Sequence, residues 1–168
     1  VFGQRFILVK GTSGSVAETD MIGAMADTID SYWYKRYFTH CQIKKDSEVS
    51  DNDIATSHLV LLGSPTSNGV FARLANRIPI AVAPTAVKIR DTEVAGESLC
   101  YYMVYPNPLN PNRYVAVIGY NNPQYIALGA EESVFFNDVS NYGWYDFKVW
   151  DGSTGRVCEK GYFNSVWE

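Results

Sequence analysis

An uninterrupted run of aliphatic residues, Leu59 to Leu62, constrains the fold of this chain more than any other feature of the sequence. Four apolar residues without polar alternation are typical of a strand covered on both faces, as parallel strands are inside an α/β domain. The small, turn-forming residues 63–68 follow, and then the helix-like segment Gly69 to Arg77. We therefore predict a central parallel strand over His58–Leu62, a tight turn and a helix. Ligands of open α/β sheets bind beyond the carboxyl ends of the strands, so a site is expected at residues 63–68.

The segments before this strand alternate between strand and helix patterns. A first strand is predicted over Arg5–Lys10, and a helix follows that either Thr12 or Ser15 can cap. A short second strand is predicted over Cys41–Lys44. The apolar face of the helix is predicted to contain residues at three- and four-residue spacing, namely Ala17, Met21, Ala24, Met25, Thr28, Ile29, Tyr32 and Trp33. This order of elements is typical of a parallel, wound sheet.

After Pro79 the predicted elements are mainly strands. Residues 80–83 and 87–89 are interpreted as one strand broken at Pro84, because proline cannot donate a hydrogen bond in mid-sheet. The remaining predictions are strands over Leu99–Tyr105, Tyr114–Ile118, Tyr145–Trp150 and Arg156–Cys158, and a short helix over Asn122–Gly129. We therefore predict a single α/β domain over residues 1–168. Its class is a three-layer flavodoxin-like or Rossmann-like domain, with a mainly parallel twisted sheet, helices on both faces and added edge strands.

Charge and composition disfavour several classes of partner. The net charge is -4 and the 14 Lys and Arg residues are scattered, so nucleic acid is not an expected partner. No apolar segment approaches the roughly 20 residues needed to span a bilayer. The cysteines, Cys41, Cys100 and Cys158, are odd in number and widely spaced, which favours buried free thiols over a disulfide framework or zinc ligands. Because the chain begins at Val1 without Met, we expect it to be either processed or cut from a longer protein.

Neither a catalytic centre nor a metal site is predicted. Residues 11–15, Gly-Thr-Ser-Gly-Ser, approach the nucleophile elbow of α/β-hydrolases but lack its last glycine, and His40 and His58 are both interpreted as structural. The acidic residues of segment 46–53 have neither the glycine nor the final glutamate of an EF-hand loop. They are interpreted as a solvated loop, in which Ser50 and Asp53 are spaced as a capping pair for one helical turn.

Two loops are candidates for binding an anion, because each follows a predicted parallel strand and precedes a helix. The candidate ligand-binding residues are Thr12, Ser13, Gly14 and Ser15 in the first loop, and Gly63, Ser64, Thr66, Ser67 and Asn68 in the second. Residues 11–19 resemble the hydroxyl-rich phosphate loop of flavodoxins, and residues 61–66 resemble their strand and flavin-side loop. The threonine spacing of the first loop differs, and no aromatic residue follows Thr66 directly. The resemblance implies binding of FMN or a nucleotide phosphate as an alternative function.

Two further segments are possible binding surfaces. Pro106–Asn112 contains three prolines spaced by asparagine and is predicted to be a rigid connection between two strands. Its Asn107 and Asn110 join the candidate ligand-binding residues, since this loop can lie at the same end of the sheet as residues 63–68. Segment 137–145 carries hydrogen-bonding and stacking groups, and Tyr142, Trp144 and Tyr145 define a second alternative, a carbohydrate-binding module.

A second resemblance covers more of the chain. Residues 46–54, 58–68, 104–115 and 161–163 resemble the C-terminal region of secreted bacterial α/β-hydrolases and prolyl-oligopeptidase-like peptidases, most specifically in the run Tyr-Pro-Asn-Pro-Leu-Asn-Pro at 105–111. The resemblance implies a non-catalytic accessory domain that packs against or positions the catalytic hydrolase domain of the same polypeptide. It also implies a secreted or periplasmic location. On this interpretation no cofactor is expected.

Overall fold

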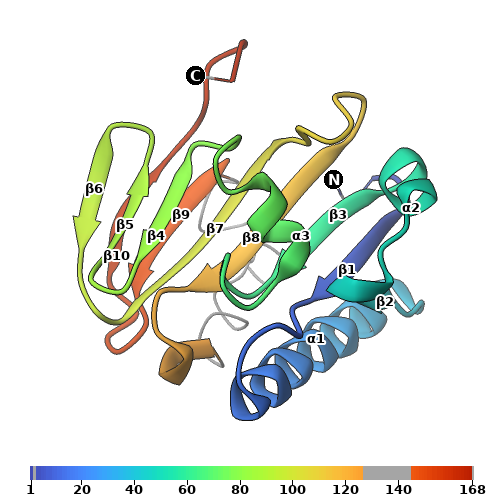
Figure 1. The fold of residues 1–168 in the computed structure, drawn as a ribbon, viewed down its shortest axis with the longest axis horizontal. Coiled ribbons are helices and arrows are strands. Elements are labelled where there is room, and N and C mark those ends of the chain that lie inside the picture. The colour runs from blue at the N-terminus through green and yellow to red at the C-terminus, as the bar shows by residue number, and fades with distance from the viewer. Residues whose placement is uncertain (2, 127–144, 168) are drawn as a thin grey trace.

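A seven-stranded mixed sheet forms the centre of the computed structural model, which describes residue 1, residues 3–126 and residues 145–167 (Figure 1). The strand order is β10-β9-β7-β8-β3-β1-β2. The strands are β1 (Phe6–Lys10), β2 (Gln42–Lys45), β3 (His58–Leu62), β7 (Leu99–Pro106), β8 (Tyr114–Tyr120), β9 (Phe147–Asp151) and β10 (Val157–Gly161). Strands β2, β1, β3 and β8 are mutually parallel, whereas the pairs β8/β7, β7/β9 and β9/β10 are antiparallel.

A second, antiparallel sheet and several helices complete the described part of the chain. The second sheet contains β4 (Ile80–Ala83), β5 (Ala86–Ile89) and β6 (Thr92–Ala95). The helices are α1 (Val16–Tyr37), α2 (Asp51–Thr56) and α3 (Gly69–Leu74), with single 3-10 turns η1 (Asp46–Glu48) and η2 (Pro123–Tyr125). None of the helices described is long and apolar enough to cross a bilayer.

The predicted fold class, a three-layer flavodoxin-like or Rossmann-like domain with a mainly parallel sheet and helices on both faces, is wrong. Half of the neighbouring strand pairs in the large sheet are antiparallel, and the second sheet is entirely so. A parallel pair needs a crossover of about a dozen residues or more, usually a helix. After residue 79 the chain instead turns within two residues, at 84–85 and at 90–91, so consecutive strands there run antiparallel. Because antiparallel neighbours need no helical crossover, the fold contains more strand than helix.

The strand predicted with a break at Pro84 is two strands. β4 and β5 pair with each other, with Ile80 opposite Ile89 and Ala83 opposite Ala86, so Pro84 lies in the turn of a hairpin. The third strand of this sheet, β6, was not predicted, because its residues Thr92–Ala95 are mostly exposed and show no apolar run.

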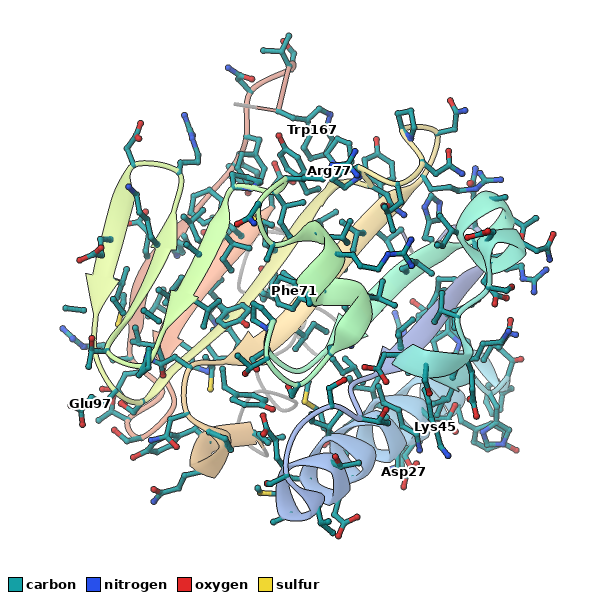
Figure 2. The ribbon with its side chains drawn as sticks, in the orientation of Figure 1. Asp27, Lys45, Phe71, Arg77, Glu97 and Trp167 are labelled. Carbon is teal, nitrogen blue, oxygen red and sulfur yellow. The ribbon has the colours of Figure 1, made fainter. Side chains whose placement is uncertain are left out.

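The predicted central strand is confirmed. All five residues of β3 are buried, and the strand lies between β1 and β8, parallel to both. One face of the sheet packs against α1 through Ile22, Met25 and Ile29. The other face packs against α3 and the second sheet, and Phe71 of α3 is completely buried in this layer (Figure 2). Of the predicted apolar face of α1, only Met25 and Ile29 are among its buried residues, whereas Met21 is partly exposed.

The registers of the parallel strands define two opposite edges of the sheet. Lys10 pairs with Leu62, and Leu62 pairs with Ile118, so β1, β3 and β8 all end at the same edge, toward the bottom of Figure 1. The proline-rich loop joins β7 to the start of β8, where Pro106 pairs with Tyr114. This loop therefore lies at the opposite edge of the sheet from residues 63–68, not at the same end.

Candidate functional site

The two predicted loops after β1 and β3 lie against each other. The backbone N–H of Gly11 donates to the carbonyl of Leu62 (3.1 Å), and the N–H of Ser13 donates to the carbonyl of Ser67 (2.9 Å). A side chain at position 11 would place its Cβ 2.4 Å from the Ser67 carbonyl oxygen, so this close approach requires glycine. We call these segments the 11–15 loop and the 63–68 loop. Their pairing continues the contact between β1 and β3 beyond the ends of both strands.

The carboxylate of Asp46, in η1, lies between the 11–15 loop and the start of α3. It accepts hydrogen bonds from the hydroxyls of Thr12 (2.5 Å) and Ser13 (3.2 Å) and from the N–H of Gly69 (2.6 Å). Burial raises the pKa of Asp46, but the hydrogen bonds from Gly69 and Thr12 outweigh it and hold the pKa below its ordinary value. An ionised carboxylate of the chain itself therefore occupies the anion position at the N-terminus of α3.

The N-terminus of α1 is likewise satisfied from within the chain. The hydroxyl of Ser15 caps the helix by accepting a hydrogen bond from the N–H of Glu18 (3.2 Å). The Glu18 carboxylate lies over the preceding loop, so that a Cβ at Gly14 would fall 2.4 Å from its Oε2. A phosphate bound at the N-terminus of α1 would thus lie beside Glu18, and one at the N-terminus of α3 would lie beside Asp46. Repulsion between the negative charges disfavours phosphate at both positions.

The buried side chain of Asn68 has a structural role that uses its whole amide group. Its Nδ2 donates to the carbonyls of Val9 (3.0 Å) and Leu62 (3.1 Å). Its Oδ1 accepts from the N–H groups of Val70 and Phe71, both at 3.1 Å, and so caps α3. Asn68 therefore fixes β1, β3 and α3 relative to one another and has no group left for a ligand.

A chain of hydroxyl groups links the 63–68 loop to Glu18. The oxygen atoms of Thr66 and Ser64 lie 2.8 Å apart, those of Ser64 and Ser67 3.1 Å, and those of Ser67 and Tyr120 3.4 Å. Tyr120 in turn donates to Glu18 Oε1 at 2.6 Å. Burial, and then the hydrogen bond to Glu18, raise the pKa of Tyr120, so its hydroxyl stays protonated.

A pocket of about 160 Å³ lies over this hydroxyl chain, at the edge where β1, β3 and β8 end. Its polar wall contains Glu18, Ser64, Thr66, Tyr120 and Asn121, and its apolar wall contains Pro65, Val82, Ala83, Pro84 and Pro123. The Asn121 amide is already engaged with the backbone, since Nδ2 donates to the carbonyl of Gly96 (2.7 Å) and Oδ1 accepts from Leu99 N–H (2.8 Å). We call this cavity the Glu18 pocket.

The other predicted site residues lie elsewhere. Asn107 and Asn110 belong to the turn at the opposite edge. There Asn107 accepts from the N–H of Leu109 (2.9 Å), and Asn110 donates to the carbonyl of Ile54 (3.0 Å). The ring of Tyr145 packs against that of Tyr162 in a tilted arrangement, with ring centroids 5.2 Å apart. Tyr142 and Trp144 lie outside the described residues, as does the end of the helix predicted over Asn122–Gly129.

Both histidines are also far from the Glu18 pocket. His58 begins β3, where its Nδ1 accepts from the Tyr114 N–H (2.8 Å) and its Nε2 lies 3.1 Å from Gln4 Oε1. Desolvation lowers the pKa of His58. His40 precedes β2, and its Nδ1 lies 2.7 Å from an Asp30 carboxylate oxygen. The starts of these parallel strands are at the edge of the sheet opposite the pocket.

The cysteines are free thiols, as predicted, although only Cys100 is fully buried; Cys41 and Cys158 are partly exposed. Burial, followed by the charge of Asp151, raises the pKa of Cys100 to about 12, so its thiol is neutral. Within the described ranges, no three His, Cys, Asp or Glu residues are grouped closely enough to hold a metal ion.

Sequence reasoning missed the three residues that define this edge: Glu18, Asp46 and Tyr120. A signal existed for Glu18, because Ser15 and Glu18 have the Ser-x-x-Glu spacing of a capping box. Asp46 was assigned to a solvated loop but is 8% exposed. Neither the family models nor the curated proteins compared with this chain give a match.

Proposed function

We propose that this chain is a non-catalytic binding domain, accessory to a hydrolase, and that its Glu18 pocket holds a polar group of the binding partner. The observation that carries this proposal is the place of the pocket in the fold. It lies beyond the carboxyl ends of β1, β3 and β8, where open sheets with parallel strands bind ligands. A few convergent oxygen atoms there face an apolar wall, which is typical of binding sites.

The polar groups of the pocket support binding rather than catalysis. A nucleophilic serine needs an adjacent base to remove its proton. The nearest neighbours of the Ser64 hydroxyl are the hydroxyls of Thr66 and Ser67. Glu18, the carboxylate of the pocket, accepts a hydrogen bond from Tyr120 instead, and both histidines lie at the opposite edge of the sheet.

The identity of the partner is supported by sequence resemblance. The segments that resemble the C-terminal region of secreted bacterial hydrolases and peptidases include the 63–68 loop, which supplies Ser64 and Thr66 to the pocket. We therefore propose the catalytic domain of the same exported polypeptide as the partner that the domain packs against or positions.

Binding of FMN or a nucleotide phosphate is less well supported by the geometry. The hydroxyls of Thr12 and Ser13 in the 11–15 loop and the N–H of Gly69 at the start of α3 already donate to Asp46. The Glu18 carboxylate lies over the loop that precedes the other helix, α1. At about 160 Å³ the pocket is also smaller than the roughly 300 Å³ at which sites for cofactor-sized ligands begin.

The proposal is tested with the purified chain in two assays. Ester and peptide p-nitroanilide substrates should give no turnover that depends on the pocket, and turnover abolished by Ser64→Ala or Glu18→Gln would overturn the non-catalytic assignment. Small cationic, neutral and anionic fragments are then titrated while ¹H–¹⁵N spectra are recorded. At least one class should shift the amides of Ser64, Thr66 and Tyr120; if none does, the pocket is not a binding site.

A further inference from the structure

We propose that the Glu18 pocket binds the protonated amine of a lysine side chain presented by a polypeptide partner. This inference rests on the proposed function, and it names the ligand class of the same site. Three independent features of the pocket support it: the direction of its hydrogen bonds, its charge, and its size and walls.

The direction of the hydrogen bonds follows from the carboxylate at one end of the hydroxyl chain. A carboxylate accepts only, and each hydroxyl has a single proton to donate. Because Tyr120 donates its only hydroxyl proton to Glu18, the Tyr120 oxygen can take part in a hydrogen bond with Ser67 only as the acceptor. By the same reasoning, Ser64 donates to Ser67 and Thr66 donates to Ser64. The Ser67 hydroxyl has one other acceptor within reach, the Ser64 carbonyl at 3.5 Å. When Ser67 donates to Tyr120 instead, all four protons point toward Glu18.

This direction determines what the pocket offers to a ligand. The Thr66 hydroxyl, at the exposed end of the hydroxyl chain, donates its proton to Ser64 and so presents only lone pairs to a ligand. Glu18 Oε1 accepts from Tyr120, and Oε2 has no hydrogen bond among the described residues. The free side-chain groups of the polar wall are therefore acceptors, and they match a hydrogen-bond donor.

The charge of the pocket selects a cation among such donors. The ion pairs within the described residues join His40 to Asp30 and Lys44 to Asp53, and neither includes Glu18. A partly buried carboxylate without a cation favours a charged ligand over a neutral hydroxyl, since hydrogen bonds to charged groups are about twice as strong as neutral ones. An ammonium has three donors and no acceptor, so it matches a site whose free side-chain groups are acceptors.

The size and the apolar wall indicate a side chain rather than a free metabolite. A cavity of about 160 Å³ is too small for a typical cofactor-sized ligand but has room for one side chain. Val82, Pro84 and Pro65 also line the pocket and can cover an aliphatic stem while the ammonium reaches Glu18. A planar guanidinium would bring five donors to a site that offers few free acceptors, which favours lysine over arginine.

The test compares a charged probe with a neutral one, in which the ammonium is converted to an acetamide. ¹H–¹⁵N spectra are recorded during titration with Nα-acetyl-lysine methylamide and with its Nε-acetylated derivative. The lysine probe should shift the amide resonances of Ser64, Thr66 and Tyr120 saturably. The acetylated probe should bind at least about tenfold more weakly, because it loses the charge-assisted hydrogen bond. Glu18→Gln should weaken binding of the lysine probe by a similar factor.

Two further variants keep the test independent of folding defects. Thr66→Val removes one acceptor at an exposed position and should also weaken the lysine probe, whereas Asp20→Asn, at an exposed position of α1, should not. Equal binding of the two probes, or unchanged binding of the lysine probe to Glu18→Gln, would overturn the lysine assignment. Tighter binding of the corresponding arginine probe, Nα-acetyl-arginine methylamide, would also overturn it. In each case the pocket would remain a binding site. If no class of fragment shifts the pocket amides, the proposed function fails as well.

Discussion

The phenol of Tyr120 donates a 2.6 Å hydrogen bond to the carboxylate of Glu18 and joins the last residue of β8 to the first turn of α1, although 102 positions separate the two residues. Tyr120 is 2% exposed, so the bond forms at the boundary between the core and the pocket. It connects the helix that covers one face of the sheet to the edge where the parallel strands end. The same pair sets the direction of the hydroxyl chain in the pocket.

Replacing Tyr120 by phenylalanine tests this connection. The variant leaves Glu18 and Ser67 without their shared partner, and hydrogen bonds to charged groups contribute about 1.5–3 kcal/mol, so the free energy of unfolding should fall by about that amount. Chemical denaturation at pH 7 measures it. The control is Tyr114→Phe, whose ring is 36% exposed, and its stability should change by less than about 0.5 kcal/mol. Equal effects of the two variants would show that the Tyr120 hydroxyl does not stabilise the fold.

Asp46 should contribute stability that depends on pH. Its pKa is lowered from the ordinary value of 3.8 in the folded chain, so an unfolded chain binds the proton more readily. The contribution is therefore fully present above pH 4 and is lost as the pH falls below that value. Asp46→Asn should cost about 2–4 kcal/mol at pH 7, because it removes the charge that four donors face, two hydroxyls and two backbone N–H groups.

Denaturation curves between pH 7 and pH 2 check this prediction. The difference in stability between the natural chain and Asp46→Asn should shrink as the pH falls below 4. The matched control is Asp27→Asn, at an exposed position of α1, which should leave the curve unchanged. A difference that stays constant down to pH 2 would contradict the role of the ionised carboxylate.

Replacing Asn68 by aspartate should strongly reduce the stability of the fold. Aspartate keeps the acceptor that caps α3, but it cannot donate to the carbonyls of Val9 and Leu62 and would place a negative charge against both oxygens. We expect a loss of about 3–5 kcal/mol, as for an uncompensated buried charge. Thermal unfolding measures it, with the exposed Asn76→Asp as control. If the two variants melt at similar temperatures, the donor function of the Asn68 amide is dispensable.

At position 38, glycine should give a more stable chain than alanine. Phe38 ends α1 in a left-handed conformation (φ 55°, ψ 30°), and its side chain is 83% exposed. The left-handed region costs a residue with a Cβ about 1–2 kcal/mol, a cost that glycine avoids. Phe38→Gly should therefore be about 1 kcal/mol more stable in urea than Phe38→Ala, which removes the ring but keeps the strain. Equal stability of the two variants would contradict this account of the helix end.

The local elements of the first half of the chain were predictable because their signals are local. The continuous aliphatic run gave β3, and the Ser50 and Asp53 spacing gave the cap of α2, where the two side chains form the expected reciprocal hydrogen bonds. The buried face of α1 was only partly predicted. Apolar residues occupy overlapping stripes on this helix, and contact with the sheet selects the one that includes Ile22 and Ala26 rather than Met21 and Ala24.

The architecture after residue 79 and the pocket could not be predicted in the same way. Strand direction there depends on turns of two residues, at 84–85 and 90–91, whose effect on pairing is visible only when the partner strand is known. The pairing of Glu18 with Tyr120 and the burial of Asp46 under α3 are long-range contacts without a signal in sequence spacing. The sequence predicted the loops after β1 and β3 as an anion site. It did not predict that the carboxylates of Glu18 and Asp46 lie beside these loops and favour a cation instead.

That preference is the central claim, and one measurement tests it most directly. ¹H–¹⁵N spectra are recorded while two samples at the same ionic strength are titrated, one with n-butylammonium chloride and one with potassium phosphate. We predict that butylammonium shifts the amide resonances of Ser64, Thr66 and Tyr120 and that Glu18→Gln weakens this binding about tenfold. Phosphate should leave the amide resonances of Ser13, Ser15 and Gly69 unmoved. Saturable shifts of Ser13, Ser15 and Gly69 with phosphate, without a response to butylammonium, would contradict the account.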